Sequence, residues 1–265
     1  MIRAETEEHW LLVTHPDHAR LAGVFADAWG NARFARPGPD NSVRVAVVRH
    51  DDGWIARDAA PLLTRDGRPE AFTRTLVGAY SAFEEIDLPA YLQVRGDATA
   101  AVAREDPHAG ILVSMHTVSL LTEMADPASI RPEHRAAHAE FVAGQRAWQD
   151  ATAARIGADP AALRRGFEFL QACDNLSLLV CSGFDQPRDL RHTHPDRSGN
   201  RHTLRCSPVG DAAWRIAPWP FGGDLLVVDV PYRKIARADC ADLPRFRAAF
   251  AAAPVEFRRI TLTAD

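Results

Sequence analysis

The 265-residue sequence contains one lysine, Lys234, so its positive charge comes almost entirely from arginine. The formal net charge is −4 and the pI is near 6.3. A chain of this kind lacks the basic field that binding to a phosphate backbone requires, and we do not expect nucleic acid as a partner. Any group that clamps a phosphate is expected to be an arginine.

Long apolar runs are missing as well. No stretch approaches the roughly 20 apolar residues that cross a bilayer. The first residues, MIRAETEEHW, are acidic where a signal peptide would be basic and then apolar. These two features predict a cytoplasmic protein that does not interact with a membrane.

Cysteine is scarce and never forms a CxxC pair, as the positions Cys173, Cys181, Cys206 and Cys240 show. A chain of this length does not need disulfide staples, so we expect reduced thiols. Cys173 and Cys181 fall in an apolar helical pattern, where a thiol is usually a small core residue. The sequence also has no nucleotide-binding glycine pattern and no nucleophile elbow.

Apolar residues follow mainly helical spacing from about residue 15 to 185, which predicts a helical core. The polar segment 184–202 is expected to be a surface loop, and four short β-branched and aromatic segments follow it. A further strand is expected at 8–14, where it could pair with this C-terminal, β-rich extension at 200–265. The predicted fold is one domain, 1–265, mainly α and α+β overall, with a small antiparallel sheet formed mostly by the C-terminal region.

Several polar residues occupy positions on the apolar stripes of these helices. In VRVAVVRHDDGW, the face of Val43 and Val47 continues into His50, with Asp51 beside it. The same spacing places further polar residues on the inward faces of other expected helices, namely His18, His116 and Asp174.

An ionised carboxylate in a core costs several kcal/mol or more unless it is paired or coordinated, so Asp174 needs a partner. Imidazole and carboxylate groups suit zinc, iron, manganese or nickel. One or two divalent ions would compensate all of these buried groups at once. Taken singly, each histidine could instead be hydrogen-bonded core, and the aspartate could pair with an arginine.

The order of these residues resembles that of the HD superfamily of metal-dependent phosphohydrolases, in which a histidine, a His-Asp doublet and a distant aspartate lie on different helices. Here the matching residues are His18, His50, Asp51 and Asp174. The blocks HARLAG, WGN, HDDGW, ILVSMH, CDNLSL and PWPF also resemble an uncharacterised bacterial family that looks related to HD proteins. The resemblance implies an HD-like helical bundle and a metal site, in which His116 is a further candidate ligand.

Such a site would hydrolyse a small phosphorylated compound or nucleotide by activating a water molecule. Asp52 could act as general base or merely cap the helix end, and His116 could be a ligand or could stabilise developing charge. Trp29, Asn31 and Trp54 are close to the ligands in sequence and could line a pocket, although core packing is the default for tryptophan.

Two alternatives stay open. An HD-fold diiron oxygenase would need about six ligands, of which the sequence offers four good ones and His116. A non-catalytic ligand-binding or interaction protein would hold the same residues in a structural ion-pair network. The histidine-rich segment 191–202, with His192, His194 and His202, is interpreted as solvated loop. The sequence does not indicate the substrate, the identity of the metal or the oligomeric state.

Overall fold

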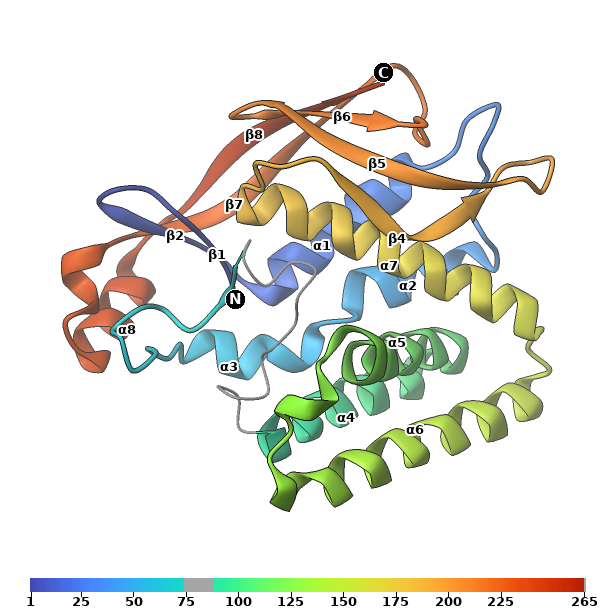
Figure 1. Ribbon diagram of the computed structural model, residues 1–265, viewed down its shortest axis with the longest axis horizontal. Helices are drawn as coiled ribbons and strands as arrows, with labels where there is room; N and C mark the ends of the chain where they lie inside the picture. Colours follow the sequence, from blue (N-terminus) through green and yellow to red (C-terminus); the bar gives the residue numbers. More distant parts are fainter. Residues whose placement is uncertain (74–87, 265) are drawn as a thin grey trace.

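The computed structural model describes residues 1–73 and 88–264, and residues 74–87 of the expected helical core lie outside this range. A curved sheet forms one layer of the molecule, and helices cover its concave face (Figure 1). The strands are β1 (Ile2–Glu5), β2 (His9–Val13), β3 (Phe72–Thr73), β4 (Arg188–Pro195), β5 (Arg201–Gly210), β6 (Ala213–Ala217), β7 (Leu225–Ala236) and β8 (Val255–Thr263). The main helices are α1 (His15–Ala28), α2 (Asp40–Arg49), α3 (Ile55–Ala59), α4 (Leu88–Glu105), α5 (Pro107–Ser119), α6 (Arg135–Ile156), α7 (Pro160–Ser182) and α8 (Leu243–Ala252).

The sheet is large and mixed, with eight strands in the order β3-β1-β2-β7-β8-β6-β5-β4. The β1–β3 and β6–β8 pairs are parallel, and the other neighbours are antiparallel. The prediction of a mainly helical, HD-like bundle with a small antiparallel sheet was therefore wrong. The expected strand 8–14 forms β2, which pairs with β7 and joins the N-terminal strands to the C-terminal ones.

The segment predicted as a surface loop contains β4 and the start of β5, so that prediction was wrong too. Residues on alternate positions of a strand point to the same face. On β4 the inward positions belong to Leu190, His192 and His194. Because two of these three are histidines, the strand has no apolar alternation that a sequence pattern could reveal.

The helices that carry the expected site have clear start and stop signals. Thr14 caps α1 by accepting a hydrogen bond from the backbone N–H of Asp17, and Pro16 occupies the first turn. Asp159 caps α7 in the same way, and Gly183 ends it with a left-handed φ of 66°. No helix in the described part of the chain is long and apolar enough to cross a membrane.

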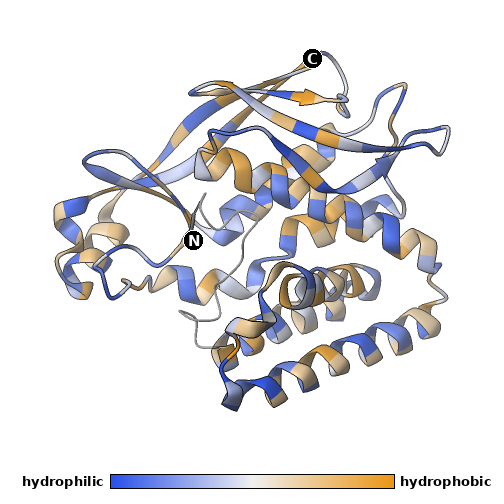
Figure 2. Cartoon of the chain, in the orientation of Figure 1, coloured by the Kyte–Doolittle hydropathy of each residue, from blue (hydrophilic) through white to orange (hydrophobic). Residues whose placement is uncertain are grey.

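Helices α1 and α7 pack together between the sheet and helices α4, α5 and α6, whereas α8 packs against β2 and β7. Figure 2 shows hydrophilic and hydrophobic residues alternating along the C-terminal strands. The inward residues of these strands share one core with the apolar residues of α1, α2, α5 and α7. The polar cluster described below lies where α1, α2, α5 and α7 meet, one layer beneath the sheet.

Candidate metal site

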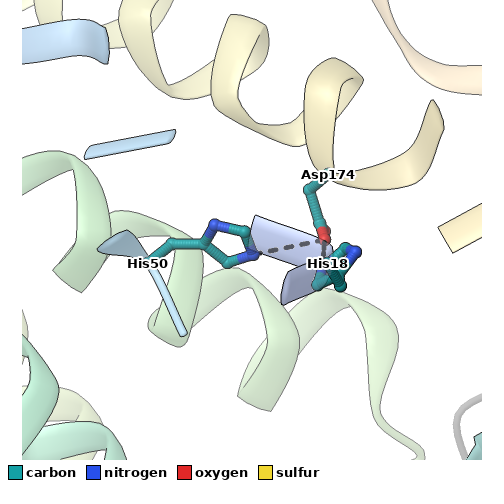
Figure 3. A group of neighbouring side chains, drawn as sticks. All are labelled: His18, His50 and Asp174. Atoms are coloured by element: carbon teal, nitrogen blue, oxygen red, sulfur yellow. Dashed lines mark ion pairs between the residues drawn. The ribbon is translucent and has the colours of Figure 1, made fainter. Parts of the chain in front are cut away.

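Four helical segments bring the sequence-predicted ligands together. His18 comes from α1, His50 and Asp51 from the end of α2, His116 from α5 and Asp174 from α7. All five side chains are buried. Figure 3 shows the imidazoles of His18 and His50 directed toward the carboxylate of Asp174. The structure thus places in one cluster residues that are up to 156 positions apart, from 18 to 174.

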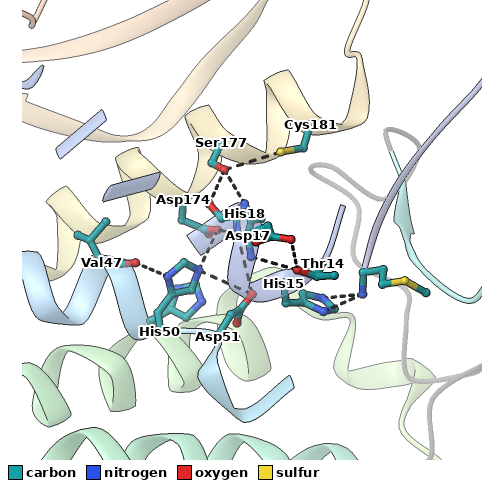
Figure 4. Close-up of polar contacts among 12 residues, drawn as sticks. Thr14, His15, Asp17, His18, Val47, His50, Asp51, Asp174, Ser177 and Cys181 are labelled. Carbon is teal, nitrogen blue, oxygen red and sulfur yellow. Dashed lines mark hydrogen bonds and ion pairs between the residues drawn. The ribbon is translucent and has the colours of Figure 1, made fainter. Parts of the chain in front are cut away.

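The Nδ1 atom of His18 is bound by a serine (Figure 4). It lies 2.7 Å from Oγ of Ser177. The single hydroxyl proton of Ser177 is donated to the carbonyl oxygen of His18 at 2.8 Å. The hydroxyl oxygen must therefore accept a hydrogen bond from Nδ1–H, so the neutral imidazole of His18 has its lone pair on Nε2. That nitrogen faces Oδ1 of Asp174 at 2.9 Å.

The other two histidines are also bound through Nδ1, which leaves Nε2 facing the cluster. Nδ1 of His50 donates to the carbonyl oxygen of Val47 at 2.7 Å, and Nδ1 of His116 donates to the side-chain oxygen of Gln171. The amide nitrogen of Gln171 in turn donates to Ser119, which fixes the orientation of the carboxamide. Such partners on the remote nitrogen are typical of histidines that bind a metal through Nε2.

The donor atoms of His18, His50 and Asp174 are spaced nearly as ligands of one ion would be, and Oδ2 of Asp51 lies slightly farther away. Nε2 of His50 lies 3.4 Å from Oδ1 of Asp174 and 3.7 Å from Oδ2 of Asp51, and Nε2 of His18 lies 3.9 Å from the same Oδ2. With metal–ligand bonds of about 2.1 Å, neighbouring ligands are about 3.0 to 3.4 Å apart. Nε2 of His50 is buried and makes no hydrogen bond despite these neighbours. An ion would satisfy it.

Both carboxylates are ionised. Burial acts to raise their pKa values, but Arg95 and His50 outweigh it at Asp51, and the neighbouring His18 and His50 outweigh it at Asp174. The pKa of each aspartate is therefore lowered below its ordinary value. One oxygen of Asp51, Oδ1, accepts a hydrogen bond of 2.6 Å from Arg95. Its other oxygen remains directed at the histidines.

Two of the histidines differ in charge in the metal-free protein. Burial alone would lower the pKa of His50, but the carboxylates of Asp51 and Asp174 raise it to about 9. Burial lowers the pKa of His116 to about 4, so this imidazole is neutral at pH 7. A neutral imidazole is the form that binds a metal.

Two overlapping groups of ligand atoms result. His18, His50 and Asp174 form one, and His50, Asp51 and His116 form the other, with the ligand atoms of each group within 4.8 Å of one another. The two groups share His50, whose Nδ1 is already bound to Val47. A single lone pair on Nε2 cannot serve two ions, so these residues fit one ion better than two.

The remaining predicted residues lie around this cluster. Asp52 forms an ion pair of 2.7 Å with Arg49. Trp29 is core, in contact with Phe169, His194 and Phe221, and the side chain of Asn31 binds backbone groups of its own loop and of residues 219 and 221. Trp54 lies next to the cluster. Its ring is covered by Arg95, which donates a hydrogen bond to Asp51.

Sequence reasoning missed Arg95, Gln171 and Ser177. A signal existed for each. Arg95 interrupts the buried stripe of α4 as Asp174 interrupts that of α7. Gln171, Asp174 and Ser177 follow at intervals of three residues, so they form one polar line along a buried helix face.

A family profile described as "Protein of unknown function (DUF3891)" matches residues 1–237 of the chain. No curated protein and no solved structure matches it significantly. Nothing in these comparisons links the chain to the HD superfamily.

Proposed function

The chain belongs to DUF3891, a family of unknown function, and we propose that this member is a metal-dependent hydrolase of a small phosphorylated compound or nucleotide. One observation carries the proposal. Three buried histidines are each bound through Nδ1 and present Nε2 to a space bounded by two ionised carboxylates. Neutral imidazole and carboxylate groups suit zinc, iron, manganese and nickel.

The residues of the cluster would have the following roles in metal binding and catalysis. His18, His50 and Asp174 would hold the ion, and Oδ2 of Asp51 lies near enough to complete the ligand set. When bound, a divalent ion would lower the pKa of a coordinated water and polarise a phosphoryl oxygen. Arg95 keeps Asp51 ionised and oriented. His116, neutral at pH 7, can bind the ion or accept a hydrogen bond from the nucleophile.

Two features support a small, phosphorylated substrate. The cluster is buried, so a large substrate has no direct approach to it. The order of His18, His50, Asp51 and Asp174 along the chain resembles that of HD phosphohydrolases, although the fold differs. The ion pair between Asp52 and Arg49 counts against Asp52 as a general base, because it holds the carboxylate on the arginine.

A non-catalytic ion-pair network is the second candidate, and the Arg95–Asp51 pair favours it. With His50 protonated, two positive charges balance the carboxylates of Asp51 and Asp174. The orphaned Nε2 of His50 speaks for a metal instead, because a structural network would be expected to hydrogen-bond it. A diiron oxygenase has less support. The two ligand groups in the described part of the chain have His50 in common, and its Nε2 atom can bind one ion only.

Metal content decides among these three functions. We would measure iron, manganese, nickel and zinc per chain in the freshly purified protein and after reconstitution. Asp174→Asn and His50→Gln remove one ligand each, and His202→Gln, outside the cluster, is the matched control. The proposal expects about one ion per chain in the wild type and the control, and loss of the ion in both ligand variants.

Phosphate release from small phosphomonoesters and nucleotides is the second readout. Activity should depend on the ion and fall to background in Asp174→Asn and His50→Gln. Full activity in both variants would refute the proposal. Two irons per chain would favour oxygen chemistry, and a folded protein that binds no metal would favour the structural network.

A further inference from the structure

A chain of hydrogen bonds joins His116 to the surface of the molecule. Its first member is Gln171, whose side-chain oxygen accepts a hydrogen bond from Nδ1 of His116. The amide nitrogen of Gln171 lies 3.4 Å from Oγ of Ser119, and this hydroxyl lies 3.3 Å from Oε2 of Glu123. Gln171 and Ser119 are buried, whereas Glu123 is exposed. The hydrogen-bond chain therefore runs from the candidate metal site to solvent.

The end of α5 brings Ser119 and Glu123 together. Helix α5 ends at Ser119 and is followed at once by a π-helical turn, Leu120–Met124. Such turns are rare and occur frequently at functional sites. Arg191 of β4 holds this turn, because its guanidinium donates to the carbonyl oxygen of Glu123 at 3.0 Å and lies 3.4 Å from Oε2 of the same residue. The carboxylate of Glu123 is thus held from two sides.

This carboxylate sets the direction of every bond in the hydrogen-bond chain. A carboxylate oxygen only accepts hydrogen bonds, so the hydroxyl of Ser119 donates its single proton to Glu123. The oxygen of Ser119 is then left to accept from the amide nitrogen of Gln171. This orientation of the carboxamide turns its oxygen, rather than its NH₂ group, toward Nδ1 of His116. The ring proton of His116 must therefore lie on Nδ1.

The position of that proton decides whether His116 can bind an ion. The imidazole is neutral at pH 7, because burial lowers its pKa to about 4, so its one ring proton lies on either Nδ1 or Nε2. With the proton on Nδ1, the lone pair of Nε2 faces the other ligand atoms. With the carboxamide of Gln171 reversed, its NH₂ group would donate to Nδ1, and the ring proton would occupy Nε2 instead.

We propose that Glu123 is a positioning residue, which selects through Ser119 and Gln171 the tautomer of His116 that leaves Nε2 free. It acts without touching the cluster. The selection of the tautomer depends only on hydrogen bonds within the chain, whereas its effect on metal binding rests on the proposed function. A merely structural role for Glu123 would stabilise the end of α5 and leave the ring proton in place.

NMR of the imidazole nitrogens in the metal-free, full chain at pH 7 tests the tautomer. The wild type should carry the proton of His116 on Nδ1, and His116→Gln assigns the signal. Glu123→Lys offers Ser119 only donors, so its hydroxyl should donate to Gln171, the carboxamide should reverse and the ring proton should lie mainly on Nε2. Glu123→Gln keeps an acceptor oxygen and should retain the wild-type tautomer.

Two further variants separate the hydrogen-bond chain from surface charge. Ser119→Ala interrupts the chain without a change of charge and should show both tautomers. Glu140→Lys reverses the charge of an exposed residue on α6 and should match the wild type. Far-UV circular dichroism verifies that each variant is folded. A ring proton on Nε2 in the wild type, or on Nδ1 alone in Glu123→Lys or Ser119→Ala, overturns the proposal.

Metal titration tests the consequence for the site, with zinc and manganese ions as probes and a chelating dye as competitor. The affinity should fall about 10- to 100-fold in Glu123→Lys and stay unchanged in Glu123→Gln and Glu140→Lys. Equal affinities in Glu123→Lys and Glu123→Gln would overturn the role of Glu123 in metal binding. A wild type that binds neither ion would refute the proposed function, while the expected change of tautomer in Glu123→Lys would still establish the selection by Glu123.

Discussion

Ser177 lies 2.7 Å from Nδ1 of His18 and donates its own proton to the carbonyl oxygen of the same residue. One hydroxyl therefore decides which nitrogen of His18 carries the proton. Because the neutral imidazole then has its lone pair on Nε2, it can bind a metal without first changing tautomer. This contact spans 159 positions in the sequence.

Ser177→Ala should weaken metal binding about 10- to 100-fold, because it removes the group that orients His18. Ser182→Ala is the control on the same helix, since the hydroxyl of Ser182 donates to backbone carbonyls of its own helix. Competition with a chelating dye measures both affinities. Equal affinities in the two variants would show that Ser177 does not position His18.

Arg95→Met should destabilise the metal-free protein by about 3 to 5 kcal/mol, since it leaves the buried Asp51 carboxylate without its cation. A bound ion supplies positive charge, so the loss should be smaller with metal. Arg44→Met breaks an exposed pair with Asp27 and should cost about 1 kcal/mol or less. Urea unfolding with chelator and with metal tests this. The same loss in both conditions would argue against an ion beside Asp51.

Stability should fall in mild acid because of His194. Burial lowers the pKa of His194 to about 4, against an ordinary value of 6.5. The unfolded chain binds this proton as pH falls below 6.5 and the folded protein does not until about pH 4, so stability is lost across that window. The loss is about 3 kcal/mol for this group.

His194→Phe removes this titration and keeps a ring against Trp29. Urea unfolding between pH 4 and 8 should show a shallower acid loss in the variant than in the wild type. If the two profiles run parallel, the acid sensitivity comes from other groups.

Gly53→Ala should disturb the segment that follows the His50–Asp51 doublet. A Cβ atom at Gly53 would lie 2.5 Å from the carbonyl oxygen of Val94 and 2.8 Å from Cβ of Ala98. We expect a loss of about 1 to 3 kcal/mol from this overpacking. Gly144 on α6 has no neighbour within 4 Å, so Gly144→Ala should instead stabilise the helix by about 0.5 to 1 kcal/mol. Thermal unfolding compares them, and a neutral Gly53→Ala would contradict the close packing.

Helical periodicity predicted much of the cluster, because the spacing of three and four residues shows which side chains share a face. From local sequence alone it predicted that His50 and Asp174 lie on the inward faces of their helices. The sheet was harder to predict. Strand β4 has histidines at two of its inward positions, so its sequence shows no apolar alternation. Strand β1 has four residues, too few for a clear pattern.

The sequence by itself determined which helix faces are buried and which polar residues interrupt them, since both follow from local spacing. Only the tertiary structure decided that His18, His50, Asp51 and Asp174 meet, that Arg95 binds Asp51, and that Ser177 and Gln171 orient two of the histidines. It also decided the mixed, eight-stranded sheet. These contacts join residues far apart in the chain, and periodicity within one element carries no information on which other element packs against it.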